Sequence, residues 1–309
     1  MIGPEKITLN VFFVSITVTY DKSSGACRIV PGREDCFLLE PASDELENPT
    51  PTPRQLILKL LLVVEGGELD VTSAVRACAL FGLSANNTRV ALARLQSAEL
   101  IETVVRGAYR LGQAGRALGE EIGAWRQAET RLREWDGSWV VALTAALGRS
   151  DRKALRARER AFGLVGLREL DDGLFIRPDN LVGGVAHTRE RLLSLGVENS
   201  TAVFQAQQFD PQRDARARLL WDASELQKTY SDGQRTLQAS MARLAGMPIE
   251  DAARESYVLG DQAMRQIVFD PMLPEPLVDS AHRRSFRELV KRYDDVGHQI
   301  WRDFLAQGR

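Results

Sequence analysis

The chain has 309 residues, with 40 lysines and arginines against 42 aspartates and glutamates, which gives a formal net charge of −2 at pH 7. This length exceeds what one ordinary core accommodates and predicts more than one domain. The charge excludes a uniformly basic protein that wraps nucleic acid. It leaves room for a local basic face, because nucleic-acid affinity depends on where the charge sits.

The cysteines and the hydropathy pattern indicate the compartment. Cys27, Cys36 and Cys78 form neither a disulfide framework nor a metal-ligand spacing. Sparse thiols are typical of a reducing compartment. No apolar run approaches the ~20 residues that a helix needs to span a bilayer. The sequence therefore predicts a cytoplasmic protein without a membrane partner.

The first 53 residues are unlike the rest of the chain. Residues 7–20 are rich in β-branched and aromatic side chains, which predicts a strand. Pro49, Pro51 and Pro53 alternate with other residues, a pattern that excludes a helix and favours an extended linker. We expect residues 1–53 to form a variable or disordered extension.

Residues 54–111 have the pattern of a winged-helix DNA-binding domain, with three helices followed by a hairpin. Asp70 is the expected N-cap of the second helix, and Arg106 and Gly107 form the hairpin turn. The predicted elements are helices at 54–65, 71–81 and about 84–98, and strands at 101–105 and 108–111.

The third of these helices carries the side chains suited to contact DNA. Thr88, Ala91, Leu92 and Leu95 recur at helical spacing and predict a face that packs on the core. Asn86, Arg89 and Ala93 fall on another face, which is flanked by Asn87, Val90 and Arg94. Asparagine pairs with adenine, and arginine pairs with guanine or a phosphate oxygen.

The charge around this helix supports the same interpretation. Residues 84–116 contain five arginines and two glutamates, a local excess of three positive charges. The alternative is an ordinary solvated helix with scattered arginines.

The remaining chain predicts a linker helix over 112–134, a middle domain over 135–209 and a helical C-terminal effector or dimerisation domain over 210–309. The middle domain reads strand, helix, strand, strand, helix, strand, the order of a ferredoxin-like βαββαβ unit. The expected helices of the last domain are 215–230, 232–244, 249–269 and 284–304. The predicted fold class is α+β, mainly helical.

Enzyme motifs are missing from the sequence. There is no glycine-rich phosphate loop, no Gly-x-Ser-x-Gly and no cluster of metal ligands. The histidines, His187, His282 and His298, have no evident catalytic partner. We predict no catalytic site, no metal site and no enzyme activity. A metal-dependent nuclease built on the ferredoxin-like unit is an alternative, but its expected first strand ends at residues 142–145 without a carboxylate.

Several motifs resemble a known family in this order and spacing. They are SANNTRVALARL at 84–95, RGAYRL at 106–111, EWDGSW at 134–139, FIRPDNL at 175–181 and DPMLP at 270–274. This set resembles the phenylacetic-acid-degradation repressor family (PaaX-like) over about residues 54–308. Three departures are Glu99, where glycine is frequent in the family, a short wing, and the N-terminal extension.

The resemblance implies a homodimer that binds a palindromic double-stranded DNA operator and leaves it when an acyl-coenzyme A thioester binds. The expected function is a repressor of an aromatic-acid catabolic operon with an effector such as phenylacetyl-coenzyme A, and no cofactor. An activator without a thioester response is the alternative. The candidate DNA contacts are Ser84, Asn86, Asn87, Arg89, Arg94, Arg106 and Arg110. The candidate effector contacts, basic groups suited to phosphates, are Arg152, Lys153, Arg156, Arg177 and His187.

Overall fold

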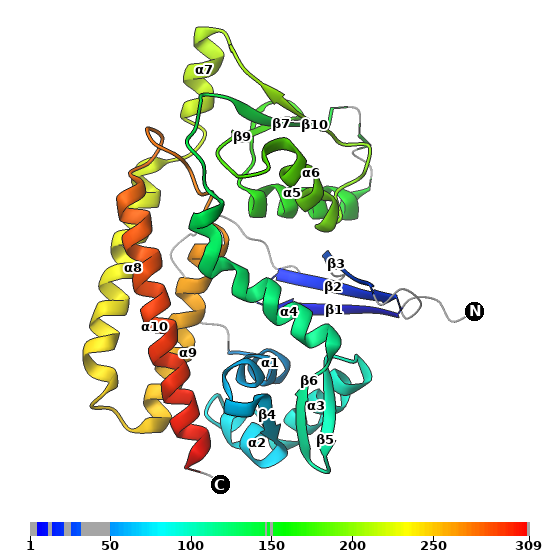
Figure 1. The fold of residues 1–309 in the computed structure, drawn as a ribbon, viewed down its shortest axis with the longest axis vertical. Coiled ribbons are helices and arrows are strands. Elements are labelled where there is room, and N and C mark those ends of the chain that lie inside the picture. The colour runs from blue at the N-terminus through cyan, green and yellow to red at the C-terminus, as the bar shows by residue number, and fades with distance from the viewer. Residues whose placement is uncertain are drawn as a thin grey trace. The chain divides into compact units, whose positions relative to one another are not determined.

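The computed structural model describes residues 5–11, 14–21, 26–31, 50–145, 147–148 and 151–307. The fold is α+β and mainly helical, with three antiparallel sheets in the described part and a helical C-terminal region (Figure 1). Contacts divide the chain into two compact units. Unit 1 contains Met1–Ala124, Thr236–Gln262 and Val290–Arg309, and unit 2 contains Trp125–Arg235 and Ala263–Leu289. The domain bounds predicted from the sequence stay predictions.

The N-terminal residues hold a three-stranded sheet in the order β1-β2-β3. Its strands are β1 (Glu5–Val11), β2 (Val14–Asp21) and β3 (Ala26–Pro31). The single strand predicted over 7–20 is wrong, because Val11 pairs with Val14 and the chain reverses where no glycine or proline marks a turn. Of the expected proline linker, Pro49 lies outside the described residues, Pro51 precedes α1 and Pro53 is the first residue of that helix.

Unit 1 continues with three helices and a hairpin at the predicted places. The elements are α1 (Pro53–Val63), a 3-10 turn η1 (Glu65–Gly67), β4 (Glu68–Asp70), α2 (Val71–Ala79), α3 (Ala85–Ser97), β5 (Ile101–Val105), β6 (Ala108–Leu111) and α4 (Gln113–Gly123). The sheet order is β4-β6-β5. The sequence did not predict β4, since three residues are too few to show a period.

Local capping explains where these helices begin. The Thr52 side chain accepts from the Gln55 backbone N–H, and the Gln55 side chain accepts from the Thr52 backbone N–H, so the two residues form a capping box ahead of Pro53. Asp70 caps α2 as predicted: its Oδ1 accepts from the Ser73 backbone N–H at 2.9 Å and its Oδ2 from the Ser73 hydroxyl at 2.7 Å.

The core of unit 1 joins the N-terminal helices to the last two helices of the chain, α9 (Ile249–Val268) and α10 (Ser280–Ala306). Trp301 and Phe304 are 4% and 2% exposed and belong to the same core cluster as Leu56 and Leu92. A run of aromatic contacts continues it: Phe81 meets Tyr257, Tyr257 meets Trp301, and Trp301 meets Phe304, with ring centroids 5.1, 6.3 and 5.5 Å apart. The C-terminal helices therefore complete the core on which α1, α2 and α3 pack.

Unit 2 contains a four-stranded antiparallel sheet with the order β10-β7-β9-β8. Its elements follow the predicted succession: β7 (Trp139–Leu143), α5 (Arg152–Val165), β8 (Arg168–Asp171), β9 (Leu174–Pro178), α6 (Gly184–Ser194) and β10 (Ala202–Ala206). Val140 and Ala142 from β7 pack with Phe162 from α5 and Leu192 from α6. The two helices thus share a core with the central strand.

Two predicted helices differ from the structure. The one expected over 112–134 ends as an α-helix at Gly123 and continues as a 3-10 segment, η2 (Ala124–Arg131). The break predicted between 230 and 232 is also wrong, because α7 (Pro211–Arg218) and α8 (Ala223–Leu244) divide at 219–222.

Gly233 lies inside α8, where a Cβ would come 2.6 Å from the Phe286 ring. This glycine permits close packing and does not end the helix. Among the described residues, none of the helices has the length and apolar character that crossing a bilayer requires.

Candidate nucleic-acid interface

The predicted recognition helix α3 begins at Ser84. The Asn87 backbone N–H donates to Ser84 Oγ at 3.2 Å, and Thr88 Oγ1 donates to the Ser84 carbonyl oxygen at 3.0 Å. Ser84 therefore acts as the N-cap while its side chain stays at the surface. This cap fixes the first turn of the helix, which carries Asn86 and Asn87.

One face of α3 is buried as the sequence predicts. Thr88, Leu92 and Leu95 are 0%, 2% and 1% exposed. All the polar residues predicted to contact DNA from this helix are exposed; they are Ser84, Asn86, Asn87, Arg89 and Arg94.

The surface opposite this buried face differs from the grouping made from the sequence. At about 100° of rotation per residue, the residues directly opposite Thr88, Leu92 and Leu95 form an outward row. The row, which we call the crest, consists of Asn86, Val90, Ala93 and Ser97, all exposed. Arg89 lies on one flank of the crest and Arg94 on the other. Val90 thus moves from the flank to the centre, which a helical wheel aligned on the buried residues could have predicted.

The β5–β6 hairpin lies beside α3 (Figure 1). Arg106 is exposed in its two-residue turn, and Gly107 has φ +83°, a conformation that favours glycine. Arg110 Nε donates to Glu102 Oε1 at 2.6 Å, so part of the positive charge predicted for the wing is already neutralised. By contrast, Arg89, Arg94 and Arg106 form no ion pair with any residue that the structure describes.

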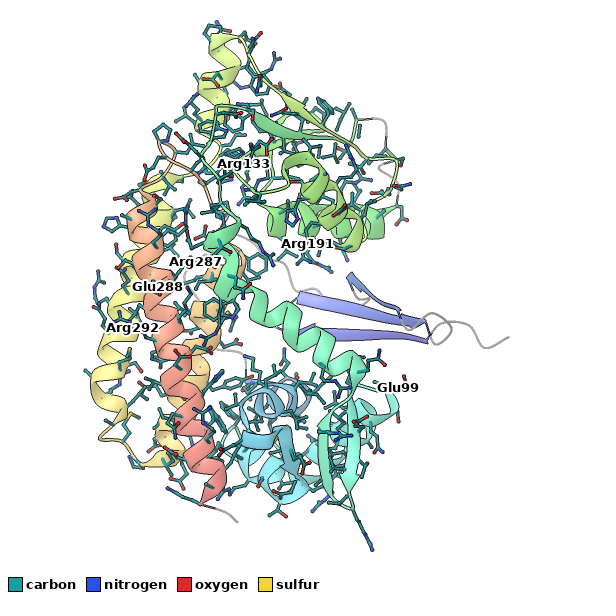
Figure 2. The ribbon with its side chains drawn as sticks, viewed as in Figure 1. Glu99, Arg133, Arg191, Arg287, Glu288 and Arg292 are labelled. Carbon is teal, nitrogen blue, oxygen red and sulfur yellow. The ribbon has the colours of Figure 1, made fainter. Side chains whose placement is uncertain are left out.

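The end of α3 closes differently from a helix that ends in glycine. Glu99, labelled in Figure 2, has φ +56°. Its N–H donates to the Gln96 carbonyl oxygen at 2.9 Å, and the Leu100 N–H donates to the Leu95 carbonyl oxygen at 3.0 Å. This is the Schellman pattern with a glutamate in the left-handed position that glycine usually occupies.

Hydrogen bonds from two arginines, Arg76 on α2 and Arg254 on α9, hold the α2–α3 pair within unit 1. The Arg76 guanidinium donates to the Phe304 carbonyl oxygen and lies 4.3 Å from the Phe304 ring centroid. Arg254 Nε donates to the Leu80 carbonyl oxygen at 2.9 Å, in the turn between α2 and α3. The α2–α3 pair is therefore held by α9 and α10 as well as by its own core.

The candidate effector residues lie in unit 2. Arg152 and Arg156 are exposed one turn apart on α5, whereas the side chain of Lys153 lies outside the described residues. Arg177 on β9 is 3% exposed, and His187 on α6 is half-buried. The exposed pair and the buried residue therefore occupy different environments.

Protein oxygens occupy the donors of Arg177. Its guanidinium donates to the carbonyl oxygens of Val165 and Pro178 and to Asn180 Oδ1, and Asn180 Nδ2 in turn donates to the Met272 carbonyl oxygen at 2.7 Å. Burial lowers the pKa of Arg177 to about 10, partly offset by Asp179. This arrangement suits a structural role and leaves little for an effector phosphate to bind.

His187 has a basic surrounding that the sequence analysis missed. Burial lowers the pKa of its imidazole, and the positive charges of Arg131 and Arg191 lower it further. Arg191 lies one helical turn after His187, a spacing visible in the sequence. The effect of Arg131, 56 positions earlier in the chain, depends on tertiary structure.

Two carboxylates of unit 2 are held by arginines. Asp171 accepts from Arg213 and Arg216 at 3.1 and 2.7 Å, and these hydrogen bonds lower its pKa. Asp179 pairs with Arg133, labelled in Figure 2, at 2.8 Å. Within the described ranges, no three His, Cys, Asp or Glu side chains come together as a metal site would require.

Comparison with known family models finds a match that includes the last of the motifs found in the sequence, DPMLP at 270–274. Residues 221–303 match the model of the PaaX-like protein C-terminal domain. These residues therefore resemble the C-terminal domain of PaaX-like proteins. The match covers α8, α9 and most of α10, so the PaaX-like domain supplies the helices that anchor α2 and α3.

A solved structure resembles this chain in fold. The uncharacterized protein Rv0674 from Mycobacterium tuberculosis superposes with a TM-score of 0.55 at 22% sequence identity, and the match covers 81% of this chain and 98% of that one. At this identity the likeness concerns the fold alone. The curated proteins contain no match to the chain.

Proposed function

We propose that this chain is a DNA-binding transcriptional regulator of the phenylacetate-catabolism type, acting as a repressor of an aromatic-acid catabolic operon. The observation that carries the proposal is the outward face of α3. It presents the exposed amide of Asn86 between two arginines, Arg89 and Arg94, that form no ion pair with a described residue, and the exposed amide of Asn87 lies on the flank beside Arg94. Asparagine and arginine at the start of a helix are suited to the major groove.

The surrounding elements support a winged helix. Three helices precede a two-stranded hairpin that lies beside the third helix, and Arg106 is exposed at the hairpin tip. The order β10-β7-β9-β8 in unit 2 is the order 4-1-3-2 of a split-βαβ, ferredoxin-like sheet. We infer a winged helix in unit 1 and a ferredoxin-like domain in unit 2.

The effector and the assembly are further parts of the proposal. An acyl-coenzyme A thioester carries phosphates that require basic partners, and Arg152 and Arg156 on α5 offer exposed guanidinium groups for them. The proposed homodimer would place two α3 helices in successive major grooves, ~34 Å apart or a multiple of that.

Salt-dependent DNA binding tests the central claim. Operator DNA selected from a randomised library is titrated with the full chain at several salt concentrations, by fluorescence anisotropy. The slope of log K against log salt should fall by about one for each of Arg89→Ala, Arg94→Ala and Arg106→Ala. Arg235→Ala is the control, because Arg235 is an exposed arginine of α8 in unit 2 and pairs with Asp232 at 3.1 Å.

Each alternative has its own outcome. A complex with no salt dependence would contradict binding through phosphates. Release of the operator on addition of acyl-coenzyme A compounds supports the repressor function. If none of these compounds changes operator affinity, an activator without a thioester response is favoured. Chelator-sensitive cleavage of labelled DNA with magnesium or manganese would favour the nuclease instead.

A further inference from the structure

An apolar side chain lies at the centre of the crest of α3. Val90 is 41% exposed, and it is absent from the residues that pack on the core of unit 1. Asn86 precedes it by one helical turn, and the small Ala93 follows it on the crest. The residues around this valine are thus polar or small, and the surface is open.

The flanking charges indicate what covers this surface. Arg89 and Arg94 lie on opposite sides of the crest and form no ion pair with the described residues. Two such guanidinium groups complement a polyanion with negative charge on both sides of a groove. A protein partner that covered Val90 would have to supply two acidic groups at the same separation.

The chemical groups that the bases present in the major groove limit which base each crest residue can contact. In the major groove only thymine presents a methyl group, and adenine presents the N6 donor and N7 acceptor that suit an asparagine amide. Asn86 and Val90 are separated by about 6 Å along the helix, close to two base-pair steps of about 3.4 Å. An amide and an isopropyl group at this spacing fit an adenine and a thymine that lie near each other.

We propose that the crest reads an A·T-containing step in each half-site, with Val90 against a thymine C5-methyl group and Asn86 on the N6 and N7 atoms of an adenine within about two base pairs. Arg89 and Arg94 hold the phosphates on either side. This proposal rests on the proposed function and adds the bases that it recognises. Val90 is a specificity-determining residue in this scheme, although it offers no hydrogen bond.

Replacing thymine with deoxyuridine removes the methyl group and leaves base pairing intact. The full chain is titrated against its selected operator, with each thymine of one half-site replaced in turn. One replacement should weaken the wild type about fourfold, the effect of burying one methyl-sized group. Val90→Ala should bind the thymine operator about as weakly as the wild type binds that deoxyuridine operator, and should no longer distinguish the two.

Val105→Ala is the matched control, because Val105 is also an exposed valine in unit 1, 62% exposed beside the wing tip. It should keep the full response to deoxyuridine. For Asn86→Ala, replacing the nearby adenine with 7-deazaadenine should have no further effect, while the wild type loses affinity. Thermal midpoints of all variants check that they remain folded.

The outcomes separate this inference from the proposed function. If binding is sequence-specific but the wild type and Val90→Ala respond equally to deoxyuridine, Val90 does not recognise a thymine methyl group. DNA binding itself would remain in place. A selected operator without a shared A·T pair also overturns it. Failure to select any sequence overturns the proposed function itself.

Discussion

Asp70 shows at the scale of one residue how local hydrogen bonds stabilise the helices around α3. Burial raises the pKa of this carboxyl, but hydrogen bonds from the side chain and backbone of Ser73 outweigh it, and the net pKa is lowered. The carboxylate caps α2, so Asp70→Ala should lower the free energy of unfolding of unit 1 by about 1 kcal/mol. Thermal unfolding followed by circular dichroism measures this.

The pH dependence gives a second readout for the same cap. Since the folded pKa lies below the unfolded one, the charge contributes stability above the unfolded value, ~3.9, and this contribution is lost as the pH falls through the folded value. Asp70→Asn keeps the cap without the charge. Its deficit against the wild type should be present at neutral pH and shrink in acid. A deficit that is the same at every pH would contradict the carboxylate's role.

Arg177 gives a prediction that separates a structural residue from an effector contact. Its guanidinium donates to three protein oxygens in a buried site. A lysine there would leave buried acceptors unsatisfied, at a cost of about 1–3 kcal/mol. Arg177→Lys should therefore accelerate amide hydrogen exchange in β9 and α5. Arg152→Lys, on the surface of α5, should change stability by less than about 0.5 kcal/mol.

Titration of the same variant with an acyl-coenzyme A thioester completes this test, because it shows whether thioester affinity changes together with exchange protection. Loss of thioester binding in Arg177→Lys without any loss of exchange protection would assign Arg177 to the effector site. Faster exchange accompanied by unchanged thioester affinity would assign it to the fold.

At the scale of elements, Glu99 carries a strain that the fold tolerates. A non-glycine residue in the left-handed region costs about 1–2 kcal/mol, and glycine recovers this less its own entropy cost of roughly 0.5–1 kcal/mol. Glu99→Gly should raise the thermal midpoint of unit 1 and leave operator affinity unchanged. Glu99→Ala is the control, because it removes the carboxylate and keeps the strained Cβ. Equal midpoints for the two variants would refute the strain argument.

The helices α1, α2 and α3 and the β5–β6 hairpin could be predicted because their periods and caps are local. Asp70, Ser84 and the turn at Arg106 and Gly107 mark boundaries in the sequence itself, and the structure confirms them. The fit of Gly233 in α8 against the Phe286 ring could not be predicted, because the two residues lie 53 positions apart. The strand β4 exists only through its pairing with β6.

In the candidate interface, too, features that depend on local spacing could be predicted and features that depend on tertiary contacts could not. The exposed and buried faces of α3 follow from spacing, so its polar residues could be placed in advance. The pairing of Arg110 with Glu102 depends on the hairpin register, and the burial of Arg177 depends on carbonyl oxygens that no side-chain pattern reveals. Val90 was predicted on the flank, because the outward face was drawn through Asn86, Arg89 and Ala93 instead of opposite the buried residues.

At the scale of the whole molecule, the core of unit 1 is assembled from both ends of the chain. Trp301 of α10 contacts Tyr257 and Phe304, and the Phe304 carbonyl oxygen accepts from Arg76 of α2. The PaaX-like domain thus contributes to the core on which the proposed DNA-binding helix α3 packs. Its folding and the positioning of α3 should be inseparable.

Trp301→Ala tests this dependence. Truncating a buried tryptophan costs about 3–5 kcal/mol, and the loss should appear as faster amide exchange in α1, α2 and α3 as well as in α9 and α10, together with weaker operator binding. Trp139→Ala is the matched control, since Trp139 is 1% exposed within unit 2 and should accelerate exchange in β7, β9 and β10 instead. If Trp301→Ala changed exchange only in α9 and α10, the N-terminal helices would have a core of their own, and the shared core would be wrong.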